Sequence, residues 1–177
     1  VQSNLLLQIC CRQRRLGQLV AQGLRRIRAG LLPVGMSALF QIAGRQPQVA
    51  NTADFGFALG PRLNAAGRLA DMTLGIECLV TDDLSRATEL AQSLDRINRE
   101  RKTIEGHMRD QALALAEDML DSDAHIPAAI CIFDPDFHEG VVGIVASRLK
   151  DKWHRPTFVF AMSQGDDTGD TLKGSGR

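Results

Sequence analysis

The sequence predicts an α/β protein in three parts: a helical part over 1–82, a long connecting helix over 83–121, and a strand–helix–strand part over 122–177. Three observations predict this class. Several short segments of the first part have apolar residues at helical spacing, one apolar stripe continues through the second part, and apolar runs flank an amphipathic segment in the third. With 44% hydrophobic residues, the 177-residue chain can bury a core.

The first part begins with three predicted helices. Gly30 suits the end of the first helix. Pro33 and Gly44 stand at the two ends of the second. Asn51 or Thr52 is expected to cap the third. The predicted helices cover 19–30, 33–44 and 53–60.

The long helix is predicted from apolar residues that recur at steps of three, four or seven between Asp83 and Met119. A helix of roughly 35 residues is about 50 Å long, and such a helix commonly connects two bodies. Because Gly106 is a poor helix former inside this stretch, a helical hairpin broken there is the alternative.

The third part has the pattern of a βαβ unit. Strands are expected over 128–134 and 155–162, with an amphipathic helix over 141–153 between them. The strands should therefore be parallel and the crossover right-handed. A third strand is expected to begin near Thr171 and to run into a glycine loop.

The formal net charge is zero but unevenly distributed: residues 1–70 carry +8, 71–136 carry −9, and 137–177 carry +1. This asymmetry is typical either of a basic face for a polyanion or of an ordinary solvated surface. No run of about 18 apolar residues occurs, so no membrane span is expected. The four cysteines form no C-x-x-C pair, and we expect reduced thiols in a cytoplasmic protein.

The loop DPDFHEG, residues 134–140, leads from a predicted strand into a predicted helix. The unpaired amides of a helix N-terminus favour an anion, Gly140 permits close approach, and His138 can donate to a phosphate oxygen. Two alternatives remain at this point. Asp134, Asp136, His138 and Glu139 are also suitable metal ligands, or the polar residues merely start the helix.

Two further segments combine glycine with cations. The stretch GPRLNAAGRL contains Arg62, Asn64 and Arg68, which suit phosphate and sugar recognition, although tight helix packing also explains its small residues. Arg62 and Arg68 are six positions apart, so a turn must intervene if both bind one ligand. The end of the chain, KGSGR, predicts an anion-binding backbone nest with four candidate residues, against the alternative of an ordinary glycine turn. These candidates are Lys173, Ser175, Gly176 and Arg177.

Four motifs together resemble the RecJ-like exonucleases of the DHH phosphoesterase superfamily. They are DFGFALGPRLNAAGRL, LDRINRERKTIE, HEGVVGIVASRLKDKWHRPTFVFA and LKGSGR, in that order, and the resemblance covers about residues 19–177. It implies that 1–82 is the C-terminal part of a DHH domain, 83–121 the connecting helix, and 122–177 the N-terminal part of a DHH-associated nucleic-acid-binding domain.

The resemblance implies a 5′→3′ exonuclease specific for single-stranded DNA, acting in DNA repair and recombination through two Mn²⁺ or Mg²⁺ ions. It implies that Arg62, Asn64 and Arg68 face the DNA from one domain, and that His138, Ser175 and Arg177 contact it from the other. A helicase or a single-strand-binding protein is an expected partner. Two alternatives are a DHH phosphoesterase for short oligonucleotides or cyclic dinucleotides, and a non-catalytic replication scaffold.

The chain departs from the family pattern in its first part. The DHH motif is absent, and residues 1–53 contain no carboxylate, although two-metal chemistry needs several. Residues 1–18 do not match, and a truncated or misread N-terminus is the hypothesis. We therefore expect an internal fragment whose catalytic residues lie upstream, which binds no metal and which is inactive alone.

Overall fold

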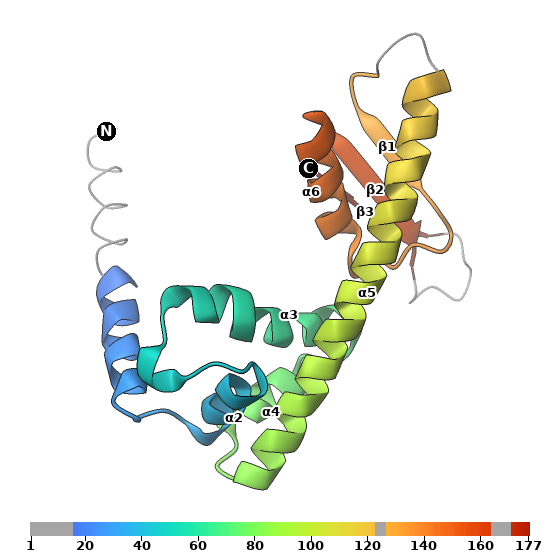
Figure 1. The fold of residues 1–177 in the computed structure, drawn as a ribbon. Helices are drawn as coiled ribbons and strands as arrows, with labels where there is room; N and C mark the ends of the chain where they lie inside the picture. Colours follow the sequence, from blue (N-terminus) through green and yellow to red (C-terminus); the bar gives the residue numbers. More distant parts are fainter. Residues whose placement is uncertain (1–15, 123–126, 164–170) are drawn as a thin grey trace, which may run out of the picture. The chain divides into compact units, whose positions relative to one another are not determined.

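The computed structural model describes residues 16–122, 127–163 and 171–177 (Figure 1). The chain divides into two compact units, 1–98 and 99–177, called here the helical unit and the α/β unit. The α/β class predicted from the sequence is confirmed. The elements after a first helix over 16–28 are α2 (Val34–Ile42), η1 (Pro47–Val49), η2 (Asp54–Leu59), α3 (Gly60–Leu69), α4 (Thr73–Val80), α5 (Leu84–Ser122), β1 (Ile130–Phe133), α6 (Val142–Trp153), β2 (Thr157–Met162) and β3 (Leu172–Gly176).

The first two helices of the helical unit end at the glycines that the sequence indicated. Gly30 has φ 80° and Gly44 has φ 64°, a conformation that costs glycine little. The amide of Leu31 donates to the carbonyl of Arg26, and that of Arg45 to Phe40, which completes a Schellman motif at each end. Helical structure is present from residue 16, so the first helix extends upstream of its predicted start.

The third helix differs from the prediction. Residues 53–60 do not form a separate helix, because the chain continues through the π-helical η2 into α3. Pro61 has no N–H and its ring clashes with the carbonyl four residues back in an α-helix, so a wider turn is favoured there. The amide of Gly60 accordingly donates to Phe55. A Cβ at Gly60 would lie 2.7 Å from that carbonyl oxygen, which explains the glycine.

Asn51 caps the start of this helix, as one of the two predicted alternatives. Its Oδ1 accepts from the amides of Ala53 and Asp54 at 2.8 and 3.3 Å, and the Asp54 carboxylate accepts from the amide of Asn51 at 2.9 Å. This reciprocal arrangement is a capping box. It fixes where the chain enters the segment that carries Arg62 and Arg68.

The core of the helical unit contains Leu39, Phe40 and Leu94, each fully buried. The helices α2 and α4 approach so closely that a Cβ at Gly35 would lie 1.5 Å from the Cys78 carbonyl oxygen. Burial raises the pKa of the Cys78 thiol, and the nearby Glu77 carboxylate adds to this effect. The Cys78 thiol is therefore part of the hydrophobic core of the helical unit.

Helix α5 is continuous over 39 residues, about 58 Å at 1.5 Å per residue. The predicted long helix is thus observed, Gly106 lies inside it, and the hairpin alternative does not form. Its apolar stripe supplies Ala87, Leu90, Ala91 and Leu94 to the core of the helical unit and Met108, Ala112 and Ala116 to that of the α/β unit. The two ends of the predicted stripe, Leu84 and Met119, are exposed. Among the described helices, none has the length and apolarity to span a membrane.

The α/β unit contains a three-stranded sheet in the order β1-β2-β3. Strands β1 and β2 are parallel, as predicted, and β3 is antiparallel to β2. Strand β1 alternates between buried and exposed residues, and Ile130 and Ile132 share a core with Val145 and Leu149 of α6. Alternation of this kind places one face of the sheet in the core.

The predicted glycine loop at the end of the chain is wrong. Residues 172–176 form a paired strand, and neither Gly174 nor Gly176 has a positive φ. Cβ atoms at these glycines would lie 2.4 Å from the Phe160 ring and 2.6 Å from the Phe158 ring. The glycines make room for these rings, so they do not form an anion-binding nest.

Candidate nucleic-acid interface

The loop between β1 and α6 has a defined hydrogen-bond pattern. The amide of Asp136 donates to Oδ1 of Asp134 at 2.8 Å, and the amide of Gly140 donates to Nδ1 of His138 at 3.0 Å. Because Nδ1 is an acceptor, the neutral imidazole carries its hydrogen on Nε2. His138 can therefore donate to an anion from Nε2 while the backbone fixes its ring.

The N-terminus of α6 follows this loop and has no side-chain cap. The first amides of a helix have no partner within the helix, and the helix dipole makes this end favourable for negative charge. Gly143 lies in the first turn, where a Cβ would approach both Nη2 of Arg177 and Oγ of Ser175 to 3.1 Å. The first turn of α6 and the end of β3 thus meet at Gly143.

Strand β3 places its polar residues in one row. Side chains alternate along a strand, so Lys173, Ser175 and Arg177 share a face, and the glycines between them lie on the other. Ser175 pairs in register with Val159, which is buried. The polar row therefore occupies the face that also packs against α6.

Two contacts link this row internally. Nη1 of Arg177 donates to Oγ of Ser175 at 3.0 Å, and Nζ of Lys173 lies 2.9 Å from Oε2 of Glu139. Arg177 is exposed, and no ion pair between its guanidinium and a carboxylate occurs within the described residues. The loop, the α6 N-terminus and β3 together form what we call the α6–β3 surface: His138, Gly140, Gly143, Lys173, Ser175 and Arg177.

The metal alternative for the loop finds no support. Asp134 and His138 accept backbone hydrogen bonds, and Glu139 is paired with Lys173. No group of three or more His, Cys, Asp or Glu side chains suited to a metal ion occurs in the described ranges.

In the helical unit, α3 carries three candidate DNA-binding residues, of which two lie on its exposed face and one on its buried face. Asn64 and Arg68 are exposed and four positions apart, so they share one helix face. Arg62 is largely buried and pairs with Asp95 of α5. Since α3 has no break between Arg62 and Arg68, the turn needed to bring both to one ligand is absent.

Two residues that matter for these surfaces had not been singled out from the sequence. Asp95 lies in the long predicted helix, where its spacing from Arg62 carries no signal. Gly143 lies inside a predicted helix, and only its contact with β3 explains it. For β3 itself a usable signal existed, because KGSGR alternates polar residues with glycine at the period of a strand.

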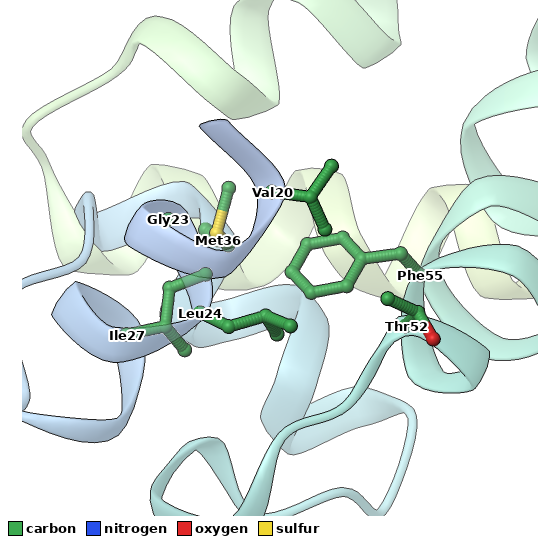
Figure 2. A pocket seen from close by; sticks show the side chains of 7 residues that line it. All are labelled: Val20, Gly23, Leu24, Ile27, Met36, Thr52 and Phe55. Carbon is green, nitrogen blue, oxygen red and sulfur yellow. The ribbon is translucent and has the colours of Figure 1, made fainter. Parts of the chain in front are cut away.

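An apolar hollow lies in the helical unit between the first helix, α2 and the start of the η2 segment (Figure 2). Its volume is about 530 Å³, and Leu24, Ile27, Met36 and Phe55 are among its lining residues. Figure 2 shows aliphatic and aromatic side chains around it and one hydroxyl, that of Thr52. None of its lining residues is a cation that could bind phosphate, so we do not include this hollow in the candidate interface.

Comparison with known proteins bears on this geometry. No family model matches the chain. The single-stranded-DNA-specific exonuclease RecJ of Salmonella typhimurium is 50% identical over 156 residues, covering 88% of this chain and 26% of that protein. The protein of the same name from Thermus thermophilus is 37% identical over 147 residues, covering 83% of this chain and 20% of that protein. The chain thus spans about a quarter of the length of the curated relatives it matches.

Solved structures agree. Crystal structures of Thermus thermophilus RecJ in complex with Mn²⁺ and with Mg²⁺ match with TM-scores of 0.66 and 0.67 at 36% identity, each over 81% of this chain and 20–21% of the other. A manganese-bound exonuclease RecJ matches with a TM-score of 0.70 at 35% identity, over 81% of this chain and 34% of that chain. From sequence and fold together, the chain belongs to the RecJ family.

Proposed function

We propose that the whole protein is a single-stranded-DNA-specific exonuclease that degrades DNA from its 5′ end by two-metal phosphodiester hydrolysis, in DNA repair and recombination. The RecJ relatives support the activity. The observation that carries the proposal for this chain is the α6–β3 surface. There the first turn of α6 meets the Ser175 hydroxyl and the Arg177 guanidinium at Gly143, and the preceding loop holds His138 beside Glu139, which pairs with Lys173 of β3.

Each group in this surface suits a DNA phosphate. Charge-assisted hydrogen bonds from an arginine are short and strong, and backbone amides add donors without an entropic cost for side chains. We assign Arg177, Ser175 and His138 as phosphate contacts. Lys173 pairs with Glu139 at the edge of the surface, and its exposed ammonium keeps N–H donors that can reach a phosphate. We also assign Gly140 and Gly176 to this surface as small residues next to the proposed contacts His138 and Arg177.

In the helical unit, we assign Asn64 and Arg68 as DNA contacts on the exposed face of α3.

We also propose the domain boundaries that the resemblance implied, with 1–82 in the DHH domain, 83–121 as connector and 122–177 in the DHH-associated domain. With one Trp and no Tyr in the chain, backbone contacts dominate over base stacking.

Mn²⁺ or Mg²⁺ would activate a water and stabilise the leaving oxygen. The RecJ structures with Mn²⁺ and Mg²⁺ support these ions as cofactors of the whole protein. The described residues do not form their site, and we propose, as the resemblance implied, that the metal ligands lie upstream of this chain. Its own residues bind the strand and neutralise its charge.

A nuclease that acts only on single strands needs a source of them. We therefore propose a helicase that unwinds duplex DNA, or a single-strand-binding protein that keeps strands apart, as the functional partner. We also propose a cytoplasmic location, because the proposed substrate is DNA and the named relatives are bacterial.

The test is Arg177→Ala in a full-length RecJ protein that contains this sequence, compared with Arg148→Ala, which removes an exposed arginine elsewhere on α6. We expect Arg177→Ala to weaken binding of single-stranded oligothymidylate by about tenfold and to lower the salt slope of log K by about 0.7, the value for one lost phosphate contact. Arg148→Ala should change neither. Equal effects of the two variants would refute the assignment of the α6–β3 surface.

A further inference from the structure

Arg62 is engaged inside the helical unit. Its Nε and Nη2 lie 2.9 and 2.8 Å from Oδ1 of Asp95, and its Nη1 donates to the carbonyl of Ala58 at 2.6 Å. Three of the five N–H groups of the guanidinium are therefore committed to protein acceptors. The side chain is only 16% exposed.

The Asp95 carboxylate makes this arginine a poor phosphate ligand. Its side chain is 7% exposed, so water screens its charge little. A phosphate that approached Arg62 would meet a neutralised cation and a buried anion of its own sign. Pulling Arg62 away would break its ion pair with the buried Asp95 carboxylate and its hydrogen bond to the Ala58 carbonyl, which is costly.

The same contacts give Arg62 a mechanical role. The Ala58 carbonyl lies in the wide π turn before α3, and Asp95 lies on α5. Arg62 therefore ties α3 to α5 within the helical unit and completes hydrogen bonding at the turn that Pro61 imposes. The direction of the exposed face with Asn64 and Arg68 depends on this tie.

We propose that Asp95 is a positioning residue for DNA binding: through Arg62 it fixes α3 so that Asn64 and Arg68 face the strand, and Arg62 itself contacts no phosphate. This inference rests on the proposed function and deepens it. It assigns a role to Asp95 on α5. It also gives different roles to Arg62 and Arg68, which belong to the same sequence motif.

Asp95→Asn distinguishes the two roles by the sign of its effect on binding. If Arg62 contacted phosphate, removing the neighbouring negative charge would free it and tighten binding of oligothymidylate. If Asp95 positions α3, binding weakens, and we expect a rise in Kd of about tenfold, the size of one lost charged hydrogen bond. The control is Asp110→Asn, which removes an exposed carboxylate from the same helix.

The salt dependence adds a measurement that loss of global stability alone would not reproduce. We expect Asp95→Asn and Arg68→Ala each to lower the salt slope of log K by about 0.7. The double variant should bind no more weakly than the weaker of the two single variants. Tighter binding, or additive losses, would overturn the proposal. Melting curves of the full-length proteins show whether each variant is folded.

If Asp95→Asn does not fold, Arg62→Lys replaces it. Lysine keeps the charge and binds phosphate, but it cannot make the forked contact to Asp95 and Ala58. The positioning role predicts a rise in Kd, and unchanged affinity would overturn it. If Arg68→Ala alone changes nothing, the α3 face binds no DNA and the inference falls with that assignment, while Arg177→Ala still tests the α6–β3 surface.

Discussion

Two arginines in glycine-containing motifs have opposite environments in the two units. Arg62 of the helical unit is largely buried and is neutralised by Asp95. Arg177 of the α/β unit is exposed, donates to Ser175 and Gly176, and has no carboxylate partner in the described part of the chain. The motif around each arginine predicted a phosphate contact. The two differ because Arg62 pairs with Asp95, a residue distant in sequence.

The two units also use glycine differently. In the helical unit, Gly35 allows two helix backbones to meet at Cys78. In the α/β unit, Gly174 and Gly176 accommodate aromatic rings from the neighbouring strand. A backbone cannot move aside without shifting a whole helix, whereas a ring can rotate, so we expect substitution of Gly35 to cost more than substitution of Gly174 or Gly176.

The largest expected effect is that of Gly35→Ala. A Cβ there would lie 1.5 Å from the Cys78 carbonyl oxygen, so α2 and α4 must separate. We expect a loss of about 3 kcal/mol or more in unfolding free energy. Denaturant titration of the full-length protein, with hydrogen exchange over 34–42, measures it. The control is Gly23→Ala, since nothing lies within 4 Å of a Cβ there and alanine favours a helix. Similar stability of the two variants would contradict the prediction.

Gly174→Ala should have a smaller effect, about 1–3 kcal/mol, because the Phe160 ring can move from its position 2.4 Å away. Hydrogen exchange of β2 and β3 reports the local loss. A second substitution, Phe160→Leu, should recover part of it. If it recovers nothing, the ring is not the reason for the glycine.

The two described cysteines should differ in reactivity. Cys78 is fully buried and its thiol has a raised pKa, whereas Cys131 is exposed on β1. Because the thiolate is the reactive form, we expect iodoacetamide to modify Cys131 at least about tenfold faster than Cys78 at neutral pH. Mass spectrometry of the two peptides measures the rates, and denaturant should remove most of the difference. Equal rates in the native protein would show that the helical core opens readily.

The smallest effect concerns pH. Hydrogen bonds from the Thr73 amide and hydroxyl lower the pKa of Asp71 below its ordinary value of 3.8. A carboxyl group with a lowered pKa stabilises the fold above its unfolded pKa, and this contribution is lost as the pH falls through its folded pKa. Below about pH 4, stability should therefore fall less steeply in Asp71→Asn, since the asparagine carbonyl oxygen also accepts hydrogen bonds from Thr73 but does not titrate. Thermal melting between pH 3 and 7 tests this, and identical slopes would contradict it.

Local rules predicted the regular elements well. The spacing of apolar residues predicted α5 and the parallel pair β1 and β2, and the glycines marked the ends of the first two helices. The prediction was wrong at η2, where a separate helix over 53–60 was expected. Near Pro61 the helix does not end but widens into a π turn and continues into α3. The prediction was also wrong at the glycines of β3, where a loop was predicted. This segment pairs with β2 as a strand.

The sequence by itself determined most of the elements, because helical and strand periodicity are properties of neighbouring residues. Its motifs were also sufficient to indicate the RecJ family. Only the tertiary structure decided which cation is available to a ligand. The free energy of a charge depends on burial and on partners brought close by folding, and Arg62 and Asp95 are 33 positions apart in the chain.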